Sequence, residues 1–252
     1  MTDHARPLPP AFYAPPSGPI RHARSDWWVL LHPPYTLWHL SYVAIGATIA
    51  PRVDGGRLAA TLVAFFLAVG VCAHALDELH GRPLRTTIPG WLLVGAAVAG
   101  LAGAVALGVV GLGRVGPGLA LFIGLGVVLT CGYNLELFGG RLHNDVTFAA
   151  AWGAFPVLTA YYAQAETLRL PALAAAAGAY WLSTAQRSLS TPARKLRRRV
   201  ASVDGTVTYG DGRTAPLSTS MLLTPLETAL KATAWGVVAL AVALVVARIT
   251  DL

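Results

Sequence analysis

Seven long apolar stretches separated by short polar gaps constrain the fold of this sequence more than any other feature. They cover residues 35–50, 57–77, 90–112, 117–134, 146–164, 170–186 and 225–248. A helix needs about 20 apolar residues to cross the hydrocarbon core of a bilayer, and fewer when it packs in a bundle. Only 12% of the residues are charged, against about 25% in soluble domains. The sequence therefore predicts an all-α fold, a polytopic transmembrane helical bundle with about seven spans.

The Lys and Arg residues indicate which side of the membrane each polar gap faces. Fourteen of the 19 fall on one side, and five, among them Arg57 and Arg114, fall on the other. Cytoplasmic loops carry the excess of basic residues. The N-terminus is therefore predicted in the cytoplasm and the C-terminus outside, in the inner or plasma membrane of the cell. Because the net charge of +7 is confined to these gaps, nucleic acid is not an expected partner.

Composition divides the chain into four expected parts. The first is proline-rich and lacks the apolar core of a signal peptide, so it is predicted to be a disordered cytoplasmic lead-in. The third is a basic cytoplasmic loop expected to bind anionic lipid headgroups. The parts are residues 1–26 (lead-in), 27–191 (main bundle), 192–223 (basic loop) and 224–252 (final spanning helix).

Two local signals lie between the last two spans. The alternation around Val203 to Tyr209 and the Asp211-Gly212 pair predict a small cytoplasmic β-hairpin. That hairpin is expected either to cap the mouth of the bundle or to serve as a linker. The segment Thr224-Pro225-Leu226-Glu227 resembles a capping box with proline at the first helical position, so the last helix is predicted to begin there.

The first group of ionisable residues lies at the cytoplasmic end of the second span. His74, Asp77 and Glu78 are spaced so that they share one face of a helix. Arg82 and Arg85 follow directly. Carboxylates and a histidine on an inward face suit divalent-metal binding or proton transfer.

A second group surrounds the turn between the fourth and fifth spans. Glu136, Arg141, His143 and Asp145 flank a Gly-Gly pair, and Tyr133 precedes them. Irregular backbone at membrane depth is tolerated where it is buried in protein or lines a wet cavity. Simpler explanations remain open: Glu136 can pair with Arg141, and Asp145 or its neighbour can cap the fifth span.

The third group, after the sixth span, is basic. Arg187 lies near the end of that span and is a candidate to hold a phosphate or carboxylate through two hydrogen bonds. The run from Arg194 to Arg199 is explained equally well by binding of anionic lipid headgroups at the membrane surface.

Across residues 30–190 the chain resembles the UbiA superfamily of intramembrane prenyltransferases. The likeness is carried by Pro34-Tyr35-Thr36-Leu37 with Gly46, by the block from His74 to Arg82-Pro83-Leu84, and by Tyr133 followed by Arg141 and Gly153. The resemblance implies a prenyl diphosphate held by magnesium and basic residues, followed by prenyl transfer or terpene cyclisation.

The resemblance and the three local groups of ionisable residues together assign expected roles, with the residues around 136–145 contributing to a relocated metal site. Asp77, Glu78 and Tyr133 are the expected catalytic residues, and Tyr133 can stabilise a cation with its ring. The expected metal ligands are His74, Asp77, Glu78, Glu136, His143 and Asp145; the expected phosphate ligands are Arg82, Arg85, Arg141, Arg187 and Arg194.

The chain departs from the family in ways that keep other functions open. His74, Glu78 and Arg82 occupy the asparagine and aspartate places of the first motif, and Gln186 and Ser190 stand where a second acidic motif is expected. The family usually has nine spans. Mixed His and carboxylate ligands favour zinc, iron or manganese over magnesium. Two alternatives follow: a transition-metal enzyme of lipid oxidation or lyase type, and a non-enzymatic lipid-binding or transport protein.

Overall fold

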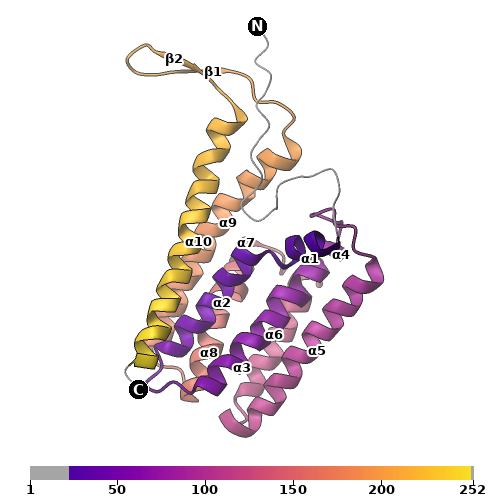
Figure 1. The fold of residues 1–252 in the computed structure, drawn as a ribbon, viewed down its shortest axis with the longest axis vertical. Helices are drawn as coiled ribbons and strands as arrows, with labels where there is room; N and C mark the ends of the chain where they lie inside the picture. Colours follow the sequence, from indigo (N-terminus) through magenta and orange to yellow (C-terminus); the bar gives the residue numbers. More distant parts are fainter. Residues whose placement is uncertain (1–22, 251–252) are drawn as a thin grey trace.

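The computed structural model describes residues 23–250 and is mostly helical, as the sequence predicts. The helices run side by side as one bundle, and α9 and α10 extend beyond the others (Figure 1). In chain order the elements are α1 (Ala23–Leu31), α2 (Pro33–Thr48), α3 (Gly55–Phe65), η1 (Phe66–Ala73), α4 (His74–Leu79), α5 (Gly90–Val115), α6 (Leu119–Asn134), α7 (Asp145–Ala149), η2 (Ala150–Ala154), α8 (Phe155–Ala165), α9 (Leu170–Arg199), β1 (Thr206–Thr208), β2 (Thr214–Pro216) and α10 (Thr219–Thr250).

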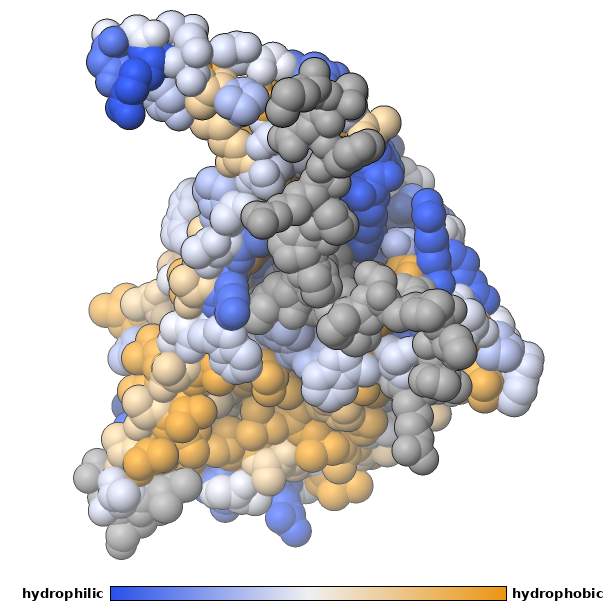
Figure 2. Space-filling model, turned by 45° about the horizontal axis from the view of Figure 1, so that its top comes forward, coloured by the Kyte–Doolittle hydropathy of each residue, from blue (hydrophilic) through white to orange (hydrophobic). Residues whose placement is uncertain are grey.

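Four helical segments are long and apolar enough to cross a membrane. They are Gly55–Leu79, Gly90–Val115, Asp145–Ala165 and Thr219–Arg248, and Leu119–Asn134 is apolar but shorter. All seven apolar stretches of the sequence fall in helical segments or within two residues of one. Apolar side chains cover the lower part of the face in Figure 2, while polar side chains gather at its upper end. This distribution is typical of a helical membrane protein.

Two of these long segments are interrupted by wider π-helical turns. The segment η1 joins α3 to α4, and η2 joins α7 to α8. Such turns often occur at functional sites. Val69 and Ala73 of η1 and Ala151 and Trp152 of η2 meet Tyr133 of α6 in one buried cluster. The two π-helical turns therefore pack against the same buried aromatic residue, near the end of α6.

The helix α2 lies in the core and packs closely on α8. A Cβ atom at Gly46 would lie 2.3 Å from the backbone oxygen of Val157, so glycine is required for this close approach. Trp38 and Tyr42, one turn apart on α2, are fully buried against Val157 and Ala179. The glycine that contributes to the UbiA-like pattern therefore has a packing role here.

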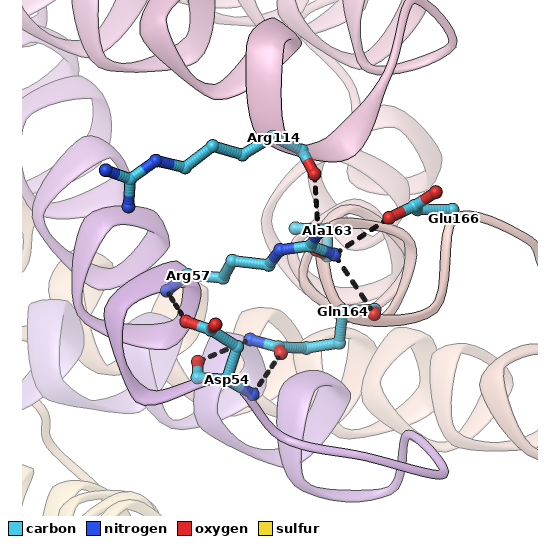
Figure 3. Close-up of polar contacts among 6 residues, drawn as sticks. All are labelled: Asp54, Arg57, Arg114, Ala163, Gln164 and Glu166. Carbon is cyan, nitrogen blue, oxygen red and sulfur yellow. Dashed lines mark hydrogen bonds and ion pairs between the residues drawn. The ribbon is translucent and has the colours of Figure 1, made fainter.

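A polar network holds three helix ends together at the far end of the bundle (Figure 3). Arg57, at the start of α3, donates to Glu166 at 3.1 Å and to the backbone oxygen of Arg114. Asp54 accepts a hydrogen bond from the amide of Arg57 and caps α3. Gln164 bonds both the amide and the carbonyl of Asp54. These contacts join the ends of α3, α5 and α8 on the side opposite α4.

The predicted hairpin is present. The strands β1 and β2 are antiparallel, with Val207 opposite Ala215. The hairpin lies beyond the ends of α9 and α10 and points away from the other helices (Figure 1). None of its residues lines a cavity at the mouth of the bundle, so the linker interpretation fits better than a cap.

Both helices beside the hairpin are longer than the sequence indicates. The helix α9 continues through Pro192 to Arg199, so the expected basic loop begins at residue 200 rather than at 192. The helix α10 begins at Thr219, and Ser218 caps it by accepting from the amide of Met221. The capping box predicted from Thr224 is therefore wrong. Its glutamate, Glu227, instead pairs with Arg197 of α9, with a 2.6 Å hydrogen bond.

The lead-in also ends earlier than predicted, because helix α1 begins at Ala23. Its Asp26 is fully buried and accepts hydrogen bonds from the amide and hydroxyl of Thr87 at 2.6 and 2.5 Å. These bonds tie α1 to the segment before α5. The predicted disorder of residues 1–22 lies outside the described residues.

Candidate anion-binding site

A cavity of about 520 Å³ opens between the helices at one end of the bundle. We call this the basic end; it holds the C-terminal half of α9, the end of α4 and the turn between α6 and α7. Side chains from α2, η1, α4, α6, α7, η2 and α9 line the cavity. Elements far apart in the sequence thus meet around one polar space.

One wall of the cavity is a basic face of α9. The α9 residues on this wall, which include Ser190 and Thr191, recur at intervals of three or four, which places them on one side of the helix. The cationic side chains on this wall are Arg187, Arg194, Lys195, Arg198 and Arg199. We call these five residues the basic face of α9.

The members of the basic face have different surroundings. Arg187 is held in place by Asp145, whose Oδ1 lies 2.8 Å from its Nε, and by the ring of Phe148, 5.1 Å below its guanidinium. Arg194 is half-buried and forms no hydrogen bond or ion pair within residues 23–250. Burial and the charge of Arg187 lower the pKa of Arg194 below its usual range. Arg194 is therefore a cation held inside the cavity without a bonded counter-ion among the described residues.

The opposite wall carries histidines and one acid. The rings of His32 and His74 lie 5.4 Å apart, and His39 bonds the carbonyl of Trp152 at 2.8 Å. Asp77 is the one carboxylate among the described residues that line the cavity. Five cations facing a single acid give the cavity a strongly positive field, which favours an anionic ligand.

The floor of the cavity contains two buried polar atoms without partners. The hydroxyl of Tyr133 and Oε1 of Gln186 find no hydrogen-bond partner within the described chain, although these residues are only 5% and 3% exposed. Unpaired buried polar atoms are rare and costly. Both residues line the cavity, so these unsatisfied atoms lie within its wall.

An apolar groove of about 280 Å³ lies next to the polar cavity. It runs between α3, η1, α5, α6 and α8, and Arg57 and Arg114 lie at its far end. Val69 and Trp152 line both spaces, so the two are adjacent. Between Gly56 and Val69 the groove follows about 20 Å of helix. Together the cavity and groove match the shape of an amphiphile with a polar head and a long apolar tail.

Some predicted site residues come together in the cavity. They are His74, Asp77, Tyr133, His143, Arg187 and Arg194. Tyr133 and His143 stack with ring centroids 4.5 Å apart.

Glu78 and Arg82 do not join them. The carboxylate of Glu78 is fully buried and accepts from the amides of Leu84 and Thr86 and from the Thr86 hydroxyl, at 2.8 to 2.9 Å. Arg82 donates to the carbonyls of Thr86 and Ile88. The expectation that His74, Asp77 and Glu78 point together into the bundle is therefore wrong for Glu78, because its carboxylate organises the turn after α4.

The remaining predicted residues lie at or outside the rim. Glu136 lies 3.8 Å from the rings of both His80 and His143, rather than on Arg141. Asp145 pairs with Arg187, while Asn144 caps α7 by accepting from the amide of Thr147. Arg85 and Arg141 are exposed and do not line the cavity.

Sequence reasoning did not assign His32, Lys195, Arg198 and Arg199 to the site. The regular spacing of the basic residues could have identified the last three, if the helix had been known to continue past Pro192. Nothing in the sequence pattern marks His32, which lies between α1 and α2.

The donor set does not fit the magnesium centre that the family resemblance implies. The described residues contain no group of three or more His, Cys, Asp or Glu side chains placed to hold a metal ion. The six expected ligands are divided among the cavity, the turn after α4 and the rim. Because these ligands are separated, they do not form a centre for zinc, iron or manganese either.

The two adjacent acids of α4 give the first prediction. Replacing Glu78 by alanine should lower the free energy of unfolding by about 2–3 kcal/mol, since buried amides lose their acceptor. Replacing exposed Asp77 by alanine should change it by less than about 0.5 kcal/mol. Thermal unfolding of the purified protein in detergent compares the two variants. Equal destabilisation by both would contradict the assigned roles.

The burial of His32 leads to a prediction of how the stability of the fold depends on pH. Burial, followed by the charges of His74, Arg198 and Arg194, lowers its pKa well below the usual range. Below about pH 6.5 the unfolded chain takes up a proton on this residue that the folded chain does not. This contribution to stability is therefore lost as the pH falls below about 6.5.

Replacing His32 by asparagine, which tolerates the positive φ of 45° at this position, should make the melting temperature less sensitive to acid. Melting curves from pH 8 to pH 5 on both proteins make the comparison. An unchanged pH profile in the variant would show that His32 is not the group responsible.

The site thus consists of a polar cavity lined by the basic face of α9 and an adjacent apolar groove. The likeness to the UbiA superfamily rests on the sequence patterns around His74, Tyr133 and Gly153. Comparisons of the chain with models of protein families, with curated proteins and with solved structures find no match.

Proposed function

We propose that this protein binds an isoprenoid or related lipid that carries a phosphate or diphosphate, and acts on it as a UbiA-type prenyltransferase or terpene cyclase. The observation that carries the proposal is the basic face of α9, which lines a cavity adjacent to an apolar groove. The anionic head occupies the cavity, and the prenyl chain extends along the groove toward Arg57 and Arg114.

Recognition of the head relies on arginine. Guanidinium groups present several N–H donors in a plane and bind phosphate oxygens through paired hydrogen bonds. Arg187 is pre-oriented by Asp145 and Phe148, so it loses little freedom on binding. Arg194 offers its charge without first breaking a contact with another described residue. The hydroxyl of Tyr133 and the amide of Gln186 supply further polar contacts.

The proposed reaction begins with ionisation of the allylic diphosphate. The bond between the allylic carbon and the diphosphate oxygen breaks, and both electrons leave on that oxygen. The basic face stabilises the growing negative charge. The positive carbon is left near the aromatic rings of Tyr133 and Trp152, which attract cations. It bonds to an acceptor, or to a double bond within the same chain, and a proton is then lost. Asp77 is the candidate base for that proton.

The placement in the membrane belongs to this proposal. Seven helical segments span the bilayer, the basic end and the N-terminus face the cytoplasm, and the C-terminus lies outside. A cysteine at Gly210 in the hairpin should be labelled from the cytoplasmic side only, and one at Gly55 from the outside only, in a protein whose own cysteines are replaced by alanine. The reverse labelling pattern would show that the protein has the opposite orientation in the membrane.

The enzyme test uses the purified protein in lipid nanodiscs. Geranyl, farnesyl and geranylgeranyl diphosphate are added, and bound ligand, released diphosphate and prenyl products are measured. Release of diphosphate with formation of a prenyl product supports the enzyme. Absence of binding by all three compounds would refute the proposal.

A second candidate, a non-enzymatic lipid-binding protein, is favoured by one specific observation. Asp77 is the one carboxylate among the described cavity residues, whereas metal-assisted ionisation usually relies on more. Binding of a prenyl diphosphate that is recovered intact after long incubation would select this candidate over the enzyme.

A further inference from the structure

We infer that the cavity holds its phosphate or diphosphate head without a divalent metal ion, and that the basic face of α9 supplies the charge a metal would otherwise provide. This inference rests on the proposed ligand class and concerns how the head is neutralised.

The first observation behind this inference is the positive charge of the side chains that line the cavity. Among the described residues, five cations and one carboxylate line the cavity, and the nearby Asp145 is paired with Arg187. A dication entering this space meets mainly positive charge, and repulsion between like charges in a partly buried site is strong. A diphosphate alone, in contrast, finds its charge compensated. The free anion is therefore favoured over its metal complex.

The second step is the ligand chemistry of a metal. Mg²⁺ requires hard oxygen ligands in near-octahedral geometry and is usually held by one or two carboxylates together with substrate phosphates. Asp77 is accompanied in the cavity by histidines, and no group of three metal-binding side chains exists among the described residues. Glu78 cannot turn to help without releasing the three hydrogen bonds that hold the turn after α4.

The third step concerns Gln186. It is buried on the α9 wall, and its Oε1 has no partner within the described chain. The same terminal amide carries the N–H donors of Nε2, which is not one of the buried unpaired atoms. An amide can thus donate to a phosphate oxygen, whereas a carboxylate at the same place would repel an uncomplexed anion and attract a cation.

The fourth step is the extent of the basic face. From Arg187 to Arg199 it covers about 18 Å along α9. That length exceeds one phosphate group and allows several cations to act on a diphosphate at once. Arg187 and Arg194 are half-buried, whereas Lys195, Arg198 and Arg199 are exposed.

The test measures binding of inorganic diphosphate and of farnesyl diphosphate to the whole protein in nanodiscs, once with EDTA and once with excess Mg²⁺. We expect binding in EDTA to be no weaker than binding in Mg²⁺. Binding that requires Mg²⁺ would overturn the inference while leaving the proposed ligand intact. Absence of binding in both conditions would overturn the proposed function itself.

Two variants sharpen the test. Gln186→Asp should weaken binding in EDTA by about tenfold, because it places a second acid beside the anion. Ser188→Asp, which adds the same charge at an exposed position of α9 outside the cavity, should have little effect. Asp77→Asn should bind in EDTA at least as tightly as the natural protein. Unchanged binding by the Gln186 variant, or lost binding by the Asp77 variant, would count against the inference.

Discussion

Replacing Arg194 by glutamate is expected to reduce binding of a prenyl diphosphate by about a hundredfold or more. A charge-assisted contact with phosphate is lost, and a negative charge is placed beside the ligand, which together remove about 3 kcal/mol of binding free energy. Arg194 is the member of the basic face that is half-buried in the cavity and unpaired within residues 23–250. Its charge is therefore available to a ligand.

Titration of farnesyl diphosphate against the protein in nanodiscs measures this effect. Arg52→Glu is the matched control, because it makes the same charge change at an exposed position near the opposite end of the bundle. Arg194→Lys should give an intermediate affinity, since it keeps the charge but loses the paired hydrogen bonds. If the glutamate variant binds as tightly as the natural protein, the head does not lie against the basic face.

Replacing Gly46 by alanine is expected to destabilise the fold by about 2–3 kcal/mol or more. The added Cβ would lie 2.3 Å from the backbone oxygen of Val157 and 2.8 Å from its Cα. Backbone atoms cannot rotate away as a side chain can, so α2 and α8 must move apart and loosen the packing around Trp38 and Tyr42.

Gly178→Ala is the matched control for this change. It also lies inside a helix, α9, and a Cβ there meets no atom within 4 Å. We expect its melting temperature to equal or slightly exceed that of the natural protein, since alanine favours a helix over glycine. Equal destabilisation by both alanines would show that helix propensity, rather than the α2–α8 contact, governs the result.

Much of the architecture could be predicted because it depends on local sequence. The apolar stretches are long, and the backbone polar groups of a chain in lipid must be paired within the helix itself. The hairpin could be predicted for a similar reason, since Asp211-Gly212 supplies the turn and Gly212 adopts the positive φ of 82° that the turn requires. These features need no knowledge of distant residues.

The ends of α9 and α10 could not be placed in this way. Pro192 and the basic run after it indicate a helix end, yet α9 continues to Arg199. Ala193 and Leu196 pack on Leu223 and Leu230 of α10, and that packing outweighs the local cost of a proline and of adjacent positive charges. The consequence is functional, because residues that resemble a surface anchor become one wall of a cavity.

The acids of α4 also separate what the sequence can predict from what only the folded structure shows. Spacing places His74, Asp77 and Glu78 close together on a helix, but it does not say which of them meets ligand. The chain after α4 folds back and brings the amides of Leu84 and Thr86 to the carboxylate of Glu78, which accepts a hydrogen bond from each. Asp77 is left as the cavity's one acid among the described residues, so the metal site expected from the sequence is divided.

The sequence by itself therefore determined a helical membrane bundle, the positions of its apolar stretches and the gathering of charge at one end. Only the tertiary structure decided which charges face each other. Hydrophobic periodicity is a property of each segment alone, whereas a cavity depends on how far apart helices pack and on which polar groups have already found partners. For this chain that difference separates an expected magnesium centre from a cavity dominated by the basic face of α9.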